Sequence, residues 1–73
     1  MNKSIYSIES KSLVEQLKQA RKEAGLNQKK AAKLICVSQS YISKVESGQI
    51  RIDVIQLKNF AKVYGKSINF FLK

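Results

Sequence analysis

The sequence predicts an all-α fold, a compact bundle of five short helices. Apolar residues recur at helical spacing in several separate stretches, and most stretches follow a good N-cap residue. The chain has no proline, and its three glycines each stand at the end of such a stretch: Gly25, Gly48 and Gly65. Seventy-three residues are enough for one domain, near the lower size limit for a core without disulfides, and Cys36 is the only cysteine.

The first helix is expected from about Ser12, as its N-cap, to Ala24, where Gly25 ends it. Four residues at helical spacing are expected to face the core: Leu13, Leu17, Ala20 and Ala24. Residues 1–11 are expected to form an N-terminal arm, and residues 12–73 are expected to form the domain. The arm carries Ile5, Tyr6 and Ile8 among serines, which leaves a short strand, a folded-over arm and disorder as open alternatives.

The next two helices lie close together in the sequence. Asn27 caps a helix over residues 28–35, and Ser38 caps a second helix, from about Gln39 to Ser47, with Gly48 as the residue that ends it. Apolar residues of both helices can face one side: Ala32, Ile35, Val37, Ile42 and Val45. Two short helices joined by a tight turn, with polar side chains left outside on the second, are typical of a DNA-binding helix-turn-helix.

The last two helices follow a loop after Gly48. Asp53 is the expected N-cap of the fourth helix, and Gly65 ends it. The expected apolar stripe of this helix consists of Val54, Leu57, Phe60, Ala61 and Tyr64. A final short helix is expected to pack three residues inward: Ile68, Phe71 and Leu72.

The charge of the chain indicates an anionic partner. Fourteen Lys and Arg against five Asp and Glu give a net charge of +9 and a pI of about 10.0. Between Ala24 and Val45 there are four lysines and no acid. Such a balance fits nucleic acid or an anionic membrane surface, although charge alone is also compatible with a solvated basic face.

Residues 27–48 and their surroundings resemble the helix-turn-helix domain of the Xre family, the group of lambdoid phage repressors and Cro proteins. The resemblance extends from Leu13 to Leu72 and is carried by Arg21, residues 25–28, 37–40, 42–43 and 46–48, and then residues 60–61, 64–65 and 67–68. It implies a lambda-repressor-like domain of five helices. The implied function is sequence-specific binding of double-stranded DNA by a transcriptional regulator, most simply a repressor.

The resemblance also implies roles for single residues. The base-contacting residues would lie on the second helix of the motif, in the major groove: Gln39, Ser40, Ser43 and Lys44. The Gln39 amide suits an adenine edge, and the Lys44 ammonium can donate to guanine. Gln28, at the N-terminus of its helix, would hold a phosphate. Further backbone contacts are expected from Tyr41, Ser47, Gln49 and Arg51.

Five residues either depart from the family pattern or complete it. Lys29 and Lys30 stand where the family usually has acids, against the helix dipole, so we expect either phosphate contacts or a solvated face. Arg21 and Glu46 match a family ion pair that would brace the first helix against the third. Cys36 stands where the family most often has glycine, so the turn is either altered or strained, and a half-buried structural thiol is expected.

Two apolar residues near the end of the chain point to self-association. Ile55 and Phe70 occupy places where the family commonly has polar groups, and we expect them to form a homodimer surface on the last two helices. A two-fold dimer would read inverted half-sites.

Other classes of function have less support in the sequence. The chain has no histidine, no Cys/His cluster and no glycine-rich phosphate loop, so we expect neither an enzyme nor a bound metal or cofactor. No run of about 18 apolar residues and no signal-peptide pattern is present, so a cytoplasmic protein is expected. Two alternatives remain: an antitoxin that binds both operator DNA and a toxin, and a basic amphipathic protein on anionic membrane, which the separate core stripes disfavour.

Overall fold

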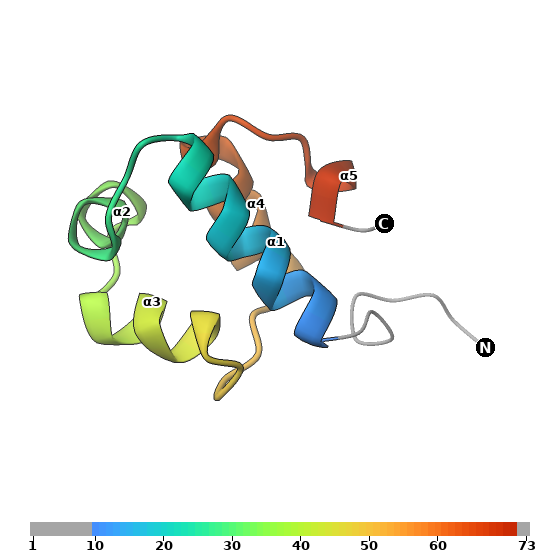
Figure 1. Cartoon of the computed structure of the whole chain (residues 1–73), viewed down its shortest axis with the longest axis horizontal. Coiled ribbons are helices and arrows are strands. Elements are labelled where there is room, and N and C mark those ends of the chain that lie inside the picture. The colour runs from blue at the N-terminus through green and yellow to red at the C-terminus, as the bar shows by residue number, and fades with distance from the viewer. Residues whose placement is uncertain (1–9, 72–73) are drawn as a thin grey trace.

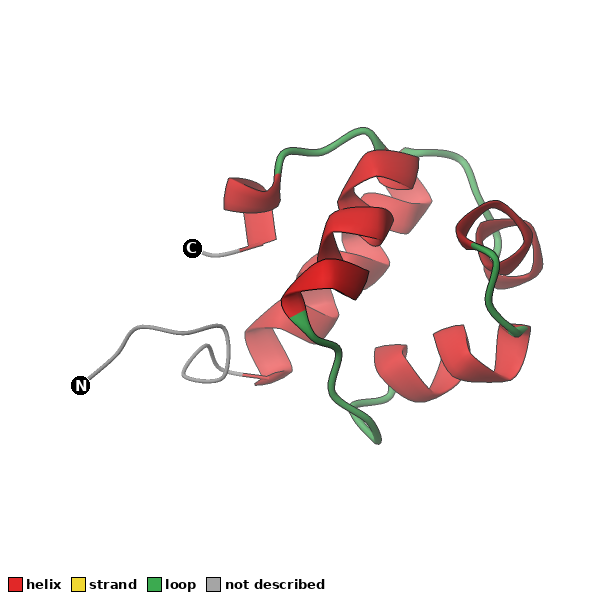
Figure 2. Cartoon of the chain, turned by 180° about the vertical axis from the view of Figure 1, so that it is seen from behind, coloured by secondary structure: helices red, strands yellow, loops and turns green. Residues whose placement is uncertain are grey.

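The computed structural model describes residues 10–71, and over that range the chain forms five helices and no strand. In chain order the helices are α1 (Ser10–Glu23), α2 (Gln28–Ile35), α3 (Gln39–Glu46), α4 (Val54–Tyr64) and α5 (Ile68–Phe71). The predicted all-α, five-helix fold is therefore confirmed. α1 and α4 run through the middle of the molecule, with α2 and α3 on one side and α5 on the other (Figures 1 and 2).

The predicted caps of the three middle helices are present. The Asn27 side chain accepts a hydrogen bond from the backbone N–H of Lys30 at 2.8 Å. Ser38 accepts one from Tyr41 N at 3.0 Å, and Asp53 accepts one from Gln56 N at 2.8 Å. Each cap satisfies a backbone donor that the first turn of a helix leaves without a helical partner. The caps therefore set where α2, α3 and α4 begin.

The first helix begins earlier than predicted. Ser10 is its first residue, so Ser12 lies inside α1 and is not its N-cap. Ser10 and Lys11 of the predicted arm thus belong to the helix, whereas residues 1–9 lie outside the described part of the chain, as does Leu72. The absence of a glycine or proline before Ser12 allows the helix to extend toward the N-terminus.

One apolar core joins the helices. Its largest fully buried side chains come from α1, α3, α4 and α5: Leu17, Ile42, Val45, Leu57, Phe60 and Phe71. The rings of Phe60 and Tyr64 pack edge to face, with centroids 5.8 Å apart. Smaller residues, Ala20, Ala31 and Ala32, let the helices approach closely where α1 and α2 enter the core.

Two residues predicted to face the core are exposed instead. Ala24 follows the last residue of α1, and its side chain is exposed because the chain turns away at Gly25, which has φ +75°. Val54 is the first residue of α4 and is 43% exposed. Packing of α4 begins one turn later, at Leu57, so the predicted stripe was wrong at its first position and right from Leu57 onward.

A polar cluster fastens α5 to α1. The Lys66 ammonium lies 2.7 Å from Glu23 Oε1 and 4.8 Å from the centre of the Phe70 ring. The Gln19 amide donates to the other carboxylate oxygen of Glu23 at 2.8 Å. The hydrogen bond from Lys66 is the main reason that the pKa of Glu23 is lowered. This cluster had no sequence signal, because its members come from distant parts of the chain.

Candidate nucleic-acid interface

α2 and α3 pack against each other and form a helix-turn-helix. The connection between them is only three residues long, from Cys36 to Ser38. Ala31, Ala32 and Ile35 of α2 and Ile42 and Val45 of α3 are buried, so the two helices share one apolar face. The opposite face of α3 is exposed in the part of the molecule that the structure describes. In Figure 1, α3 lies along one edge of the molecule, with its axis across the direction of α1.

The free face of α3 carries the predicted base-contacting residues. All four are exposed, and they come from the first and second turns of the helix: Gln39, Ser40, Ser43 and Lys44. The structure thus brings together an amide, two hydroxyls and an ammonium on one convex helix surface. Hydrogen-bonding groups of this kind, on a helix narrow enough for the major groove, can distinguish base pairs by their edges.

Tyr41 differs from its neighbours on α3. Its side chain is half-buried, and its ring lies 6.4 Å from that of Phe60, at an angle of 56°. The aromatic body of the side chain therefore belongs to the margin of the core. Only its hydroxyl end is suited to a contact with a DNA phosphate.

α2 combines exposed lysines with a half-buried amide at its first residue. Lys29, Lys30 and Lys33 are exposed, whereas Gln28 is half-buried and donates from Nε2 to Glu46 Oε1 at 3.1 Å. Lysines in the first turn of a helix oppose its dipole, and no acid on α2 compensates for them. The segment from α2 to α3 contains one acid, Glu46, and that carboxylate is buried and paired.

A buried ion pair joins α1 to the end of α3. Arg21 Nε donates to Glu46 Oε2 at 2.7 Å, and Arg21 Nη2 donates to Glu46 Oε1 at 3.1 Å. Nη1 of the same guanidinium donates to the Leu26 carbonyl at 2.8 Å. Arg21 is 8% exposed and Glu46 5%, so water screens the pair only weakly. The hydrogen bond to Glu46 raises the pKa of Arg21 above its usual value, against the opposing effect of burial.

The loop after α3 is tied to the end of that helix. The Ser47 hydroxyl donates to the Lys44 carbonyl at 3.2 Å, and it accepts a hydrogen bond from Gln49 Nε2 at 2.9 Å. The hydroxyl proton of Ser47 is thus already donated to a carbonyl of the protein. To donate it to a phosphate instead, the hydroxyl group would have to rotate. Arg51 is exposed in the same loop.

Of the two turns that the sequence left open at Cys36, altered or strained, the structure has the strained, left-handed one. The φ of Cys36 is 69° and its ψ is 44°, and it is the only residue other than glycine with positive φ in the described part of the chain. The expectation of a half-buried thiol was wrong, because the side chain is exposed. The thiol therefore lies outside the apolar core that α2 and α3 share.

Tyr64 carries a buried hydroxyl that the sequence did not reveal. The residue is 4% exposed, and its hydroxyl has no hydrogen-bond partner among residues 10–71. Burial, and to a lesser extent the nearby charge of Glu46, raises the pKa of Tyr64 to about 12. Its place in the apolar stripe gave no signal of an unpaired polar atom.

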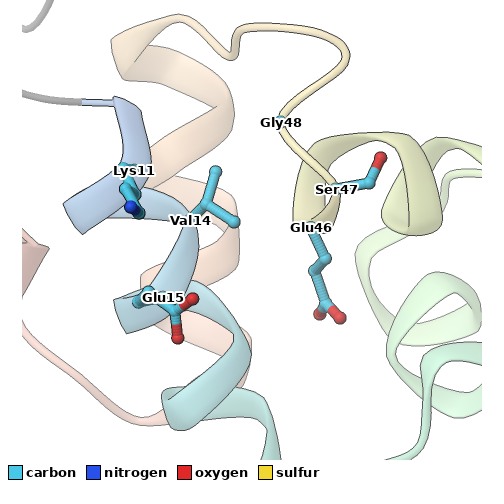
Figure 3. A pocket seen from close by; sticks show the side chains of 6 residues that line it. All are labelled: Lys11, Val14, Glu15, Glu46, Ser47 and Gly48. Atoms are coloured by element: carbon cyan, nitrogen blue, oxygen red, sulfur yellow. The ribbon is translucent and has the colours of Figure 1, made fainter.

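An open hollow of about 360 Å³ lies between the first turns of α1 and the end of α3 (Figure 3). It is lined by Lys11, Val14 and Glu15 on one side and by Glu46, Ser47 and Gly48 on the other. The Glu46 carboxylate at its edge is already engaged by Arg21 and Gln28. The hollow therefore offers a ligand few free polar groups that converge.

Within residues 10–71 no group of three or more His, Cys, Asp or Glu side chains could hold a metal ion. No helix in that range is long and apolar enough to cross a membrane.

The geometry defines a class of protein: a small helical domain with an exposed, polar recognition helix in a helix-turn-helix. A comparison with known families agrees. The helix-turn-helix family of the Cro and phage-repressor type matches residues 17–71, and the chain belongs to this family. It is a family of DNA-binding proteins that regulate transcription, and not a family of enzymes. A search of curated proteins gave no match.

Proposed function

We propose that the protein binds a specific sequence in double-stranded DNA and represses transcription from the site it covers. The observation that carries this proposal is the exposed face of α3, where Gln39, Ser40, Ser43 and Lys44 stand together on a helix that the Arg21–Glu46 pair holds against α1. With α3 in the major groove, these side chains reach base edges.

Base contacts are assigned by the chemistry of each side chain. Gln39, in the first turn of α3, presents a donor and an acceptor to an adenine edge. Lys44, further along the same face, donates to guanine O6 or N7. Ser40 and Ser43 are short and contact only groups close to the helix. The Arg21–Glu46 pair fixes the end of the helix, so that these contacts occur in one register.

Backbone contacts come from α2, from α3 itself and from the loop that follows α3. Gln28 and Lys29 lie at the N-terminus of α2, where helix geometry leaves backbone N–H groups free for a phosphate. Tyr41, Ser47, Gln49 and Arg51 supply further contacts from α3 and the following loop. Such contacts position the protein and depend on salt, but they carry no sequence information.

The homodimer expected from the sequence is part of the proposal. Ile55 is 70% exposed, which makes it the most exposed large apolar residue of the described chain. Phe70 is half-buried, because its ring packs against Phe71 and lies beside the Lys66 ammonium. Ile55 is therefore the main candidate for the centre of the dimer surface, with Phe70 at its margin. Two copies related by a two-fold axis would place two recognition helices about one helical turn of DNA, roughly 34 Å, apart.

Selection of bound duplexes from a random DNA pool tests the proposal. We expect the pool to converge on an inverted repeat whose half-sites are about 10 base pairs apart. Retention of all sequences alike, with strong salt dependence, would reduce the function to unspecific binding of polyanions. In the antitoxin alternative, the protein would copurify with a toxic partner from its native host. A cytoplasmic location stays a prediction.

A further inference from the structure

The Gln28 side chain connects the start of α2 to the end of α3. Its Nε2 lies 3.1 Å from Glu46 Oε1 across a partly buried contact. A carboxylate offers only acceptors, so the amide must direct its nitrogen at Glu46 and its oxygen away from it. The orientation of the Gln28 amide, which is free to turn in an exposed glutamine, is therefore fixed by its partner.

Glu46 is itself held firmly enough to act as an anchor. Two nitrogens of Arg21 bind its two oxygens, and the third contact of the guanidinium is the Leu26 carbonyl just before α2. Because Glu46 is 5% exposed, water does not compete for these bonds. The positive charge of Arg21 also offsets the carboxylate charge, which would otherwise repel a phosphate near Gln28.

We propose that Glu46 is a positioning residue for DNA binding: it holds the Gln28 amide with one Nε2 hydrogen on Glu46 and leaves the other hydrogen for a DNA phosphate. The inference rests on the proposed function and adds a role for a residue that does not touch DNA. Because the Gln28 side chain is already ordered in the folded protein, DNA binding costs less side-chain entropy than it would with a freely rotating glutamine. Because Glu46 ends α3, the phosphate contact is also tied to the position of the recognition helix.

A double-mutant cycle in DNA binding tests the link. Gln28→Ala, Glu46→Gln and the double variant are titrated with a duplex selected by the wild-type protein. Gln28→Ala weakens binding about fivefold in the wild-type background, as expected for one hydrogen bond, but less than about twofold in the Glu46→Gln background. In that background an NH2 donor replaces one of the two oxygens that accept from Arg21 and Gln28, so residue 46 no longer accepts all three hydrogen bonds. Gln39→Ala is the matched control: it removes an amide that does not contact Glu46, so its effect is the same in both backgrounds. Equal effects of Gln28→Ala in both backgrounds would overturn the inference.

If Glu46→Gln does not fold, a measurement on the wild-type protein tests the positioning role of Glu46. In nuclear magnetic resonance spectra of the free protein, the side-chain amide protons of Gln28 are expected to exchange with water more slowly than those of the exposed Gln39. Addition of the selected duplex is expected to shift the second Gln28 proton while the first stays protected. Exchange as fast as that of Gln39 contradicts the positioning role. A protein that prefers no DNA sequence contradicts the proposed function instead, and the free-protein spectra separate the two failures.

Discussion

The Arg21–Glu46 pair allows a quantitative test of how the recognition helix is held. Removing one partner of a buried ion pair costs about 3–5 kcal/mol, because the other charge is left buried without its counterion. A domain of this length has a free energy of unfolding of roughly 4–11 kcal/mol. Arg21→Met or Glu46→Leu alone should therefore remove a large part of the total stability. The double variant replaces both charges by apolar groups and should be destabilised by less than the sum of the two single variants, with a coupling of about 2 kcal/mol or more.

Urea denaturation followed by circular dichroism provides the four free energies of this cycle. The matched control is the pair of Glu23 and Lys66, which has the same 2.7 Å separation but whose side chains are 45% and 26% exposed. The same cycle on that pair should give a coupling too small to resolve, because water screens exposed charges. A coupling near zero for Arg21 and Glu46, or equal couplings for both pairs, would refute the reasoning that burial makes the Arg21–Glu46 coupling the stronger one.

Three further substitutions test other parts of the structure. Cys36→Gly should raise the free energy of unfolding by about 0.5–1 kcal/mol in urea denaturation, because glycine accepts φ 69° without strain. Cys36→Ala should not raise it, and equal effects of the two substitutions would contradict backbone strain at this position. Tyr64→Phe should leave stability at pH 7 unchanged or raise it by up to about 1 kcal/mol, because it removes a hydroxyl without a partner in the described chain. The pKa of Tyr64 is higher in the folded state, so the unfolded state loses the phenolic proton first. Wild-type stability should therefore fall as the pH rises from about 10 to about 12. An equal fall in Tyr64→Phe would contradict the assignment of this pH dependence to Tyr64. Ile55→Lys should give a folded monomer in light scattering, whereas Leu34→Lys, also at an exposed apolar residue, should remain dimeric; a dimeric Ile55→Lys would move the interface elsewhere.

The helices could be predicted from the sequence because their signals are local. Three capping side chains each accept a hydrogen bond from the backbone N–H three residues further on: Asn27, Ser38 and Asp53. In the sequence, a capping residue directly before an apolar run indicates such a helix start. The start of α1 lacked such a signal, and Ser12 was mistaken for a cap although the helix begins at Ser10. The sequence also did not show where the apolar stripes of α1 and α4 end. Ala24 and Val54 have the right helical spacing, but they lie where neighbouring helices no longer cover them.

The site was predictable only in part, for a physical reason. Which residues lie on the free face of α3 follows from helical periodicity within one short segment. The contact of Gln28 with Glu46 depends on how α2 crosses α3, and periodicity does not specify that crossing. The unpaired hydroxyl of Tyr64 and the cluster of Lys66 with Glu23 likewise arise from packing between distant segments. At Cys36, the family pattern left an altered turn and a strained turn open, and the expectation of a half-buried thiol was wrong because the side chain is exposed.

The claim that the exposed face of α3 reads bases is tested most directly by repeating the random-pool selection with Lys44→Ala and Lys29→Ala. Lys44 lies on that face, whereas Lys29 lies at the start of α2, beside the DNA backbone in the proposed complex. Lys44→Ala should remove the preference at one base pair of each half-site, at a cost of about 1–3 kcal/mol per half-site. Lys29→Ala should keep the selected sequence, weaken all duplexes alike and lower the salt dependence by about one unit for each phosphate that the variant no longer binds. An unchanged selected sequence with Lys44→Ala, together with equal weakening of selected and scrambled duplexes, would contradict the claim.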